Sequence, residues 1–251
     1  MIQIRREQMV VLEESVVGSF VARTKEHLRE HFPRHFEVAG EERVERVIRM
    51  GISRGKAYGV TQEEPLRVFV ERMLMHGACF DEDGQLPWAR ELLMQQDGGQ
   101  FEQMGRVQAR SLSYLDEVEG PEGVAHLSAL RKAQRMTLPE IPALTPMERR
   151  AAIREHLNAL YPSKAKNLGG AGIDALGARA AAKAAGIGLA SDAGSLTIAT
   201  LMMLLGDGFL ADPVHDWAGA SLAESAKLPE RRRLEQLLDR SKQQLRAWFG
   251  E

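Results

Sequence analysis

The stretch Gly77–Ala89, which reads GACFDEDGQLPWA, gathers the residue types most suggestive of chemistry. Three acidic residues occupy positions 81–83 in front of a glycine, and the single cysteine of the chain, Cys79, precedes them. Clustered carboxylates can bind Ca²⁺, and a thiolate can act as a nucleophile. The spacing does not match an EF-hand loop, which needs oxygen ligands at alternating positions and a glutamate at the twelfth.

A second stretch tests the meaning of the acidic cluster. Residues 206–218 read GDGFLADPVHDWA and align with the first stretch at an offset of 129. The second copy keeps Asp83, as Asp212, but has no acid at the positions of Asp81 and Glu82. We therefore interpret Asp83 and Asp212 as turn or helix-cap residues rather than metal ligands.

Three histidines, His27, His31 and His35, are spaced by four residues, as zinc ligands on one helix face can be. Pro33 falls between the last two and would break the helix that aligns them. Only the first of the three is kept in the second copy, as His156. We expect no metal site here, and we interpret His27 and His156 as packing or hydrogen-bonding residues.

The other candidates for reactive or ligand-binding residues have even less support in the sequence. Cys79 has His76 close by in sequence, but Gly77 ends the helix between them and the equivalent of Cys79 is Gly208. We expect a free, half-buried thiol. The glycine-rich segments near residue 170 lack the lysine of a phosphate-binding loop. The sequence thus predicts no catalytic residue, no cofactor and no metal site.

The elements that carry these residues form an internal repeat, because residues 25–93 align without gaps with residues 154–222. The matched positions are those that fix turns and core contacts. They are Pro33, Gly59, Phe80, Asp83 and Trp88 in the first copy, and Pro162, Gly188, Phe209, Asp212 and Trp217 in the second. A tandem duplication explains this pattern.

Each copy is expected to be helical. A first helix ends near Pro33, and a second spans residues 41–57 before Gly59. Thr61 with Glu64 can form a capping box that opens a third helix. Further helices are expected near residues 101–117 and 121–136.

The second unit is expected to open at another capping box, formed by Thr145 and Glu148. The C-terminal stretch is amphipathic, and it is expected to pack across the duplication. Its apolar residues share one helix face: Leu234, Leu237, Leu238, Leu245 and Phe249. We divide the chain into a first helical unit (1–118), a helical and proline-containing linker (119–144) and a second unit with the C-terminal helix (145–251).

Composition supports an all-α fold, a helical bundle of two tandem units, with residues 1–4 as the only strand candidate. Hydrophobic residues make up 44% of the 251 residues and charged residues 27%, with a net charge of −2. Nothing in this balance favours a nucleic-acid partner. The single cysteine suits a reducing compartment, and the N-terminus lacks the apolar core of an export signal. We expect a cytoplasmic protein that does not span a membrane.

The two copies differ most in charge. Residues 41–76 contain thirteen Asp, Glu, Lys or Arg residues, whereas residues 170–205 contain four. On the third helix, three basic positions that look solvent-facing in the first copy become leucine in the second: Arg67, Arg72 and His76 become Leu196, Leu201 and Leu205. Either this helix is buried within the chain, or its leucines and Thr200 form a docking patch for another protein.

The first unit resembles a family of small bacterial helical proteins encoded near type VI secretion and polymorphic toxin systems. The resemblance rests on IQIRREQM, HLREHFP, GEERVERVIRMGISRGKAYGVT and GACFDEDGQLPWA, and it covers about residues 1–100. It implies a non-enzymatic protein-interaction module, a chaperone or loading adaptor for a secreted toxin. The alternative is an immunity protein that binds and neutralises its toxin. The expected partner in both cases is a protein encoded nearby.

Overall fold

The computed structural model describes residues 6–138 and 143–249, with side chains from Glu14 onward. Within these residues the chain forms twelve α-helices and three short 3-10 turns, and no strand occurs among them. The predicted all-α fold is therefore confirmed. The strand candidate at residues 1–4 lies outside the described residues.

The elements run in two consecutive sets. The first set is α1 (Arg6–His31), α2 (Pro33–Ala39), α3 (Glu41–Ala57), α4 (Glu63–His76), η1 (Phe80–Glu82), α5 (Pro87–Met94) and α6 (Gly99–Val118). The second is η2 (Pro121–Gly123), α7 (Val124–Gln134), α8 (Pro146–Leu160), α9 (Pro162–Gly186), α10 (Asp192–Leu205), η3 (Pro213–His215), α11 (Asp216–Glu224) and α12 (Glu230–Ala247).

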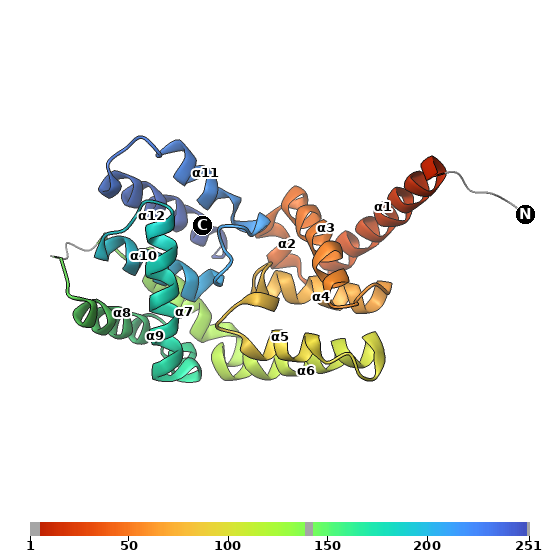
Figure 1. Ribbon diagram of the computed structural model, residues 1–251, viewed down its shortest axis with the longest axis horizontal. Coiled ribbons are helices and arrows are strands. Elements are labelled where there is room, and N and C mark those ends of the chain that lie inside the picture. The colour runs from red at the N-terminus through yellow and green to blue at the C-terminus, as the bar shows by residue number, and fades with distance from the viewer. Residues whose placement is uncertain (1–5, 139–142, 250–251) are drawn as a thin grey trace, which may run out of the picture.

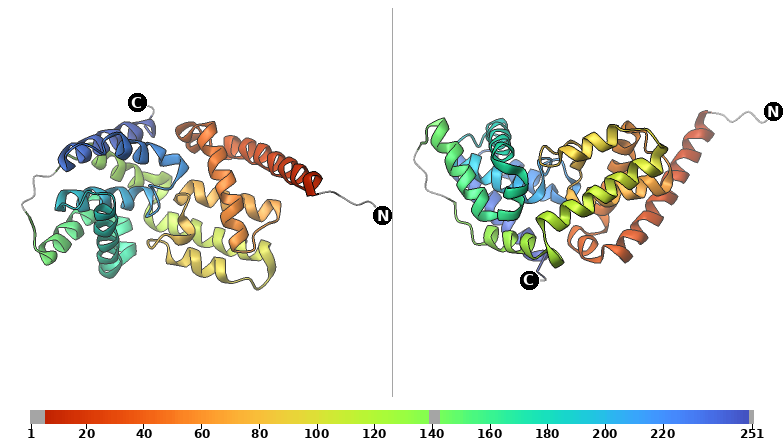
Figure 2. Two further views of the ribbon diagram at one scale, coloured as in Figure 1. Left: turned by 45° about the horizontal axis from the view of Figure 1, so that its top comes forward. Right: turned by 90° about the horizontal axis from the view of Figure 1, so that it is seen from below.

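The two sets form two lobes that lie side by side (Figure 1). The N-terminal part of α1 projects away from the first lobe, and both views of Figure 2 show the same projection. Helix α7, which lies in the segment predicted as a linker, packs against α12 and buries Ala129, Leu130 and Ala133. This segment is therefore part of the second lobe's core.

The helices of the two lobes correspond in position. Helix α10 begins and ends 129 residues after α4, as the repeat predicts. Three pairs of equivalent glycines also have positive φ angles, at places where helices of the two lobes end or are interrupted. The pairs are Gly40 and Gly169, Gly59 and Gly188, and Gly77 and Gly206. The tandem duplication that would explain this equivalence stays a prediction.

The two expected capping boxes have different outcomes. Thr145 and Glu148 form theirs at the start of α8, as predicted. The box expected from Thr61 and Glu64 does not form. Instead, the backbone N–H groups of Thr61 and Gln62 donate to the side-chain oxygen of Gln100, at 2.7 and 2.8 Å. Because α6 lies beside this helix start, an amide from a distant segment takes the place of the local cap.

The C-terminal helix buries the predicted face, with Leu234, Leu237, Leu238 and Leu245 inside. Helix α12 packs mainly on α11 and α7 within its own lobe. Its C-terminal end reaches the first lobe, where the Trp248 ring meets His35 edge-on with ring centroids 5.0 Å apart. The C-terminal end of α12 therefore contributes to the contact between the two lobes.

Candidate functional site

The two lobes are joined by a reciprocal pair of hydrogen bonds from Asp83 and Asp212. The Asp83 carboxylate accepts from the backbone N–H of Asp207 at 3.0 Å, and the Asp212 carboxylate accepts from the backbone N–H of Ala78 at 2.7 Å. Positions 78 and 207 are themselves 129 residues apart, so the two bonds are related by the repeat. The other oxygen of each aspartate caps its own turn, through Gln85 N–H and Val214 N–H at 2.8 Å.

The predicted role of Asp83 and Asp212 as turn residues is thus confirmed, and their second role across the junction is new. Gly77 and Gly206 permit the approach. A Cβ atom at Gly77 would lie 3.0 Å from the Leu205 carbonyl oxygen, and one at Gly206 would lie 2.9 Å from Asp83 Oδ2. Both glycines also have positive φ, which a side chain would strain.

The remaining acids of the opening stretch form an ion pair. The Arg54 guanidinium binds both oxygens of the buried Asp81 carboxylate, at 2.7 to 2.9 Å, and also contacts Glu82 at 2.8 Å. The equivalents of Asp81 and Glu82 in the second copy are Leu210 and Ala211. Both acids are therefore absent together from that copy, as expected for a structural ion-pair network.

Cys79 is half-buried and free, as predicted, and burial raises the pKa of its thiol. His27 donates or accepts a hydrogen bond with Glu71 at 2.7 Å, and His156 does the same with Thr200 at 2.8 Å. Their predicted hydrogen-bonding role is confirmed. Among the described residues, no group of three His, Cys, Asp or Glu side chains is placed to hold a metal ion.

Of the two alternatives for the third helix of the second copy, the structure shows burial within the chain, and the docking patch is wrong. Leu196, Thr200 and Leu201 are 8%, 2% and 2% exposed, and Leu205 is partly buried. Helices α7, α8, α9 and α12 surround α10 and cover these residues. The loss of charge in this copy reflects burial within the chain.

The first copy also departs from expectation, because Arg72 is only 3% exposed. Its guanidinium contacts Glu71 and the Ser111 hydroxyl of α6, at 3.2 and 3.3 Å. Helix α6 covers this position, which sequence periodicity alone could not show.

A cavity of about 380 Å³ lies at the junction of the two lobes. Its walls come from both lobes: α2, α4 and the turn after it, the end of α6 and the start of α7, the start of α9, the end of α10 and the turn after it, and the residue that follows α12. Asp83 and Asp212 both line it, and so do His35 and Lys164, which occupy equivalent positions of the repeat. A volume in this range suits a small organic ligand.

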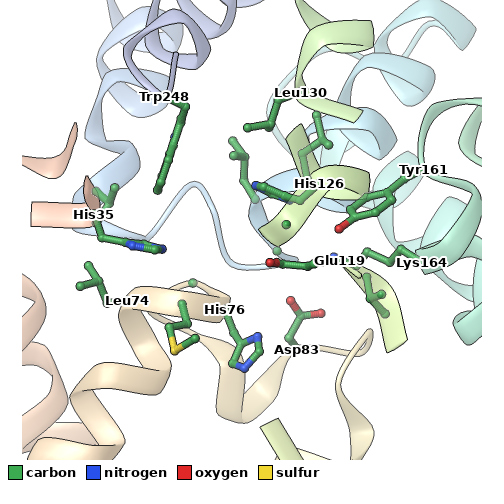
Figure 3. A pocket seen from close by; sticks show the side chains of 18 of the residues that line it. His35, Leu74, His76, Asp83, Glu119, His126, Leu130, Tyr161, Lys164 and Trp248 are labelled. Atoms are coloured by element: carbon green, nitrogen blue, oxygen red, sulfur yellow. The ribbon is translucent and has the colours of Figure 1, made fainter. Parts of the chain in front are cut away.

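One side of the cavity is polar. Figure 3 shows Tyr161, Lys164, Glu119 and Asp83 gathered there. Lys164 donates to the Met203 carbonyl oxygen at 2.8 Å, and it makes no other hydrogen bond among the described residues. The hydroxyl groups of Tyr114 and Tyr161 are buried, and neither has a hydrogen-bond partner in the described part of the chain. Groups that are buried in this way normally find a partner, in the protein or in what occupies the cavity.

Burial sets the protonation of these groups. It lowers the pKa of Lys164, against the opposing effect of Asp83, Glu119 and Asp207. It raises the pKa of Glu119, which Lys164 only partly offsets. Burial also raises the pKa of Asp83, with the neighbouring charge of Asp207 acting in the same direction.

The opposite side of the cavity is aromatic and apolar, with His35, Trp248 and Leu74 (Figure 3). Burial lowers the pKa of His35 and of His126 to about 4, so both rings are neutral at pH 7. His76 is held neutral in the same way, with a pKa of about 3, and hydrogen-bonds the Ser111 hydroxyl at 2.6 Å.

A smaller apolar cavity of about 230 Å³ lies between α8 and α9. Gly177 and Ala181 line it, at the positions where the first copy has Ile48 and Ile52. It has few polar groups, and nothing in the structure indicates an occupant.

Sequence reasoning missed the central cavity. Glu119, Tyr161 and Lys164 lie far from Asp83 in the sequence, and none of these three carries a recognisable motif. One signal was available, because Lys164 stands where the first copy has His35, in a segment otherwise rich in small apolar residues.

The chain matches no protein-family model, and no significant similarity links it to a curated protein or to a solved structure. No helix in the described part of the chain combines the length and the apolarity needed to cross a bilayer.

Proposed function

We propose that this protein is a binding module that holds a small organic ligand in the cavity between its two lobes. The observation that carries the proposal is the cavity itself, about 380 Å³ in volume, where the hydroxyls of Tyr114 and Tyr161 have no hydrogen-bond partner among the described residues. A buried hydroxyl with no partner costs roughly 1–3 kcal/mol, and a polar group of a ligand would remove that cost.

The two sides of the cavity define the ligand. The polar side offers hydroxyl and ammonium donors, and the other side offers the Trp248 and His35 rings. The ligand is therefore a compact molecule with an apolar or aromatic body and a polar group at one end. Because Lys164 is opposed by Asp83 and Glu119, the site does not demand a net charge from the ligand.

Benzyl alcohol is a suitable probe, and its binding can be followed by ligand-observed NMR. We expect binding to the native protein, and loss of binding in Leu74→Trp, which fills the cavity from its apolar side. Leu112→Trp, on the exposed face of α6, is the matched control and should bind normally. Equal binding to both variants, or none to the native protein, would overturn the proposal.

Tyr161→Phe separates binding from folding. In the empty protein, removal of a hydroxyl without a partner should leave the free energy of unfolding unchanged or slightly higher. Affinity for the probe should fall by up to about tenfold. A variant that is destabilised but binds normally would show that the hydroxyl serves the fold.

A second candidate function is the adaptor or chaperone role that the resemblance implies. The observation that favours it is an uncharged exposed face on α6, formed by Phe101, Gly105, Gln108, Ala109 and Leu112. Helix α6 lies at the outer edge of the first lobe (Figures 1 and 2). An uncharged face that exposes two large apolar side chains, Phe101 and Leu112, suits an apolar segment of a secreted toxin.

Co-expression with the products of adjacent genes tests this role. A complex that keeps a toxin soluble or supports its secretion, and that Phe101→Glu with Leu112→Glu abolishes, is expected for a chaperone. A complex that instead neutralises the toxin would make the protein an immunity protein. Absence of any complex with these products would contradict both.

A further inference from the structure

Lys164 lines the cavity, and among the described residues its ammonium forms no ion pair with a carboxylate. It makes one hydrogen bond, to the Met203 carbonyl oxygen. Asp83 and Glu119 act on it only from a longer distance. A lysine in such a place usually pairs directly with an acid. Here the space between the amine and the two acids belongs to the cavity.

Glu119 is likewise unpaired, since its carboxyl group makes no hydrogen bond or ion pair among the described residues. Figure 3 shows it beside Lys164, with the Tyr161 side chain on the same side of the cavity. The Lys164 amine, the Glu119 carboxyl group and the Tyr161 phenol thus line the same part of the cavity. Among the described residues, no hydrogen bond or ion pair joins any two of these groups.

We propose that Lys164 captures the carbonyl group of a small aldehyde or ketone as an imine in this cavity. The inference rests on the proposed binding function and names the chemistry of its ligand. An imine-forming lysine needs an unprotonated amine, and desolvation is the usual way that proteins provide one.

The step balances with the groups present. The Lys164 nitrogen forms a bond to the carbonyl carbon, and its proton passes to the carbonyl oxygen, giving a carbinolamine. Glu119 then protonates that oxygen, which leaves as water while the C=N bond forms. The iminium nitrogen returns its proton to Glu119. One water is released, and nothing is oxidised or reduced.

The other side chains that line the cavity can assist the steps of imine formation. The Tyr161 hydroxyl can donate to the carbonyl oxygen, which would give it the partner it lacks. Burial lowers the pKa of Lys164 and raises the pKa of Glu119, which favours the neutral amine and the protonated acid that these steps use. The His35 and Trp248 rings, on the opposite side of the cavity, would contact the body of the bound compound (Figure 3).

Benzaldehyde with cyanoborohydride tests the inference, because reduction fixes any imine as a benzylamine that intact mass and peptide mapping can locate. We expect one benzyl group on Lys164 of the native protein at pH 7. An ordinary lysine, with a pKa near 10.4, is unprotonated there in only about one molecule in a few thousand. Lys166, exposed on the same helix, is the internal control and should stay unmodified.

Variants sharpen the test. Lys164→Arg should abolish trapping, whereas Lys166→Arg should leave it unchanged. Glu119→Gln should slow trapping on the order of a hundredfold, the effect of losing a proton donor. The mapping on native protein does not depend on the folding of any variant.

The possible failures are distinguishable. If benzyl alcohol binds in the cavity but benzaldehyde labels lysines without preference for Lys164, the binding function stands and the imine proposal falls. If benzyl alcohol does not bind and Lys164 is not labelled, both fall.

Discussion

At the scale of single residues, burial in the central cavity decides which groups are charged. His35, His76 and His126 come from α2, α4 and α7, and desolvation lowers the pKa of each to about 4, 3 and 4. The charges of Arg72 and Lys164 add to this effect on His76. The sequence drew attention to His35 and His76 for other reasons, but it gave no sign that they and His126 line one cavity.

The histidines predict how stability depends on pH. Their folded pKa values lie below the unfolded value of about 6.5, so the unfolded chain binds more protons between pH 6.5 and 4. Their contribution is fully present above pH 6.5 and is lost as the pH falls through this window. Each histidine adds a slope of at most about 1.4 kcal/mol per pH unit, and less where water enters the cavity.

Urea unfolding of the native protein and of His76→Leu at pH 7 and pH 5 measures this slope. Leucine is the residue at the equivalent position, 205, so the substitution keeps a side chain that the fold accepts. The variant should lose less stability on acidification than the native protein. An unchanged slope, matching that of the exposed control His31→Gln, would contradict the assignment.

At the scale of elements, the turns that follow α4 and α10 meet at equivalent positions. A Cβ atom at Gly208 would lie 2.4 Å from Cys79 Cβ, and positions 79 and 208 correspond in the repeat. Only one of the two equivalent residues can therefore carry a side chain. This explains why the cysteine of the first copy meets glycine in the second, without any role for the thiol.

The close approach of positions 79 and 208 predicts how substitutions there change the stability of the protein. Gly208→Ala should destabilise the protein by roughly 1–3 kcal/mol, because the added methyl group overlaps Cys79. The exchange of the two residues, Cys79→Gly with Gly208→Cys, should recover most of that loss. Chemical denaturation of the single and double variants measures the coupling. Additive effects would show that the two positions do not compete for one space.

At the scale of the whole molecule, the lobes are connected by more than one contact. The Asp83 and Asp212 bonds, the end of α12 against His35, and the shared cavity all bridge them. The lobes therefore stabilise each other, even though each resembles a complete helical unit.

We expect the native protein to unfold in a single calorimetric transition, because neither lobe keeps its buried junction alone. Asp83→Ala combined with Asp212→Ala removes both reciprocal bonds and leaves four backbone N–H groups without acceptors. The double variant should unfold at lower temperature with a broader or divided transition. Two transitions in the native protein would contradict this view.

The sequence by itself determined what depends on neighbouring residues. The bounds of α3, the capping box at Thr145, the buried face of α12 and the turn role of Asp83 follow from local rules of propensity, capping and periodicity. The repeat also indicated which helices would correspond, since glycines and prolines mark the same interruptions in both copies.

Only the tertiary structure decided which surfaces are covered and which polar groups meet. The burial of Arg72 and Leu201, the cap that Gln100 provides, and the cavity around Lys164 each depend on segments far apart in the chain. Helical periodicity shows that a residue lies on one face of its helix. It does not show whether another helix packs there, because that depends on how the whole chain fills its interior.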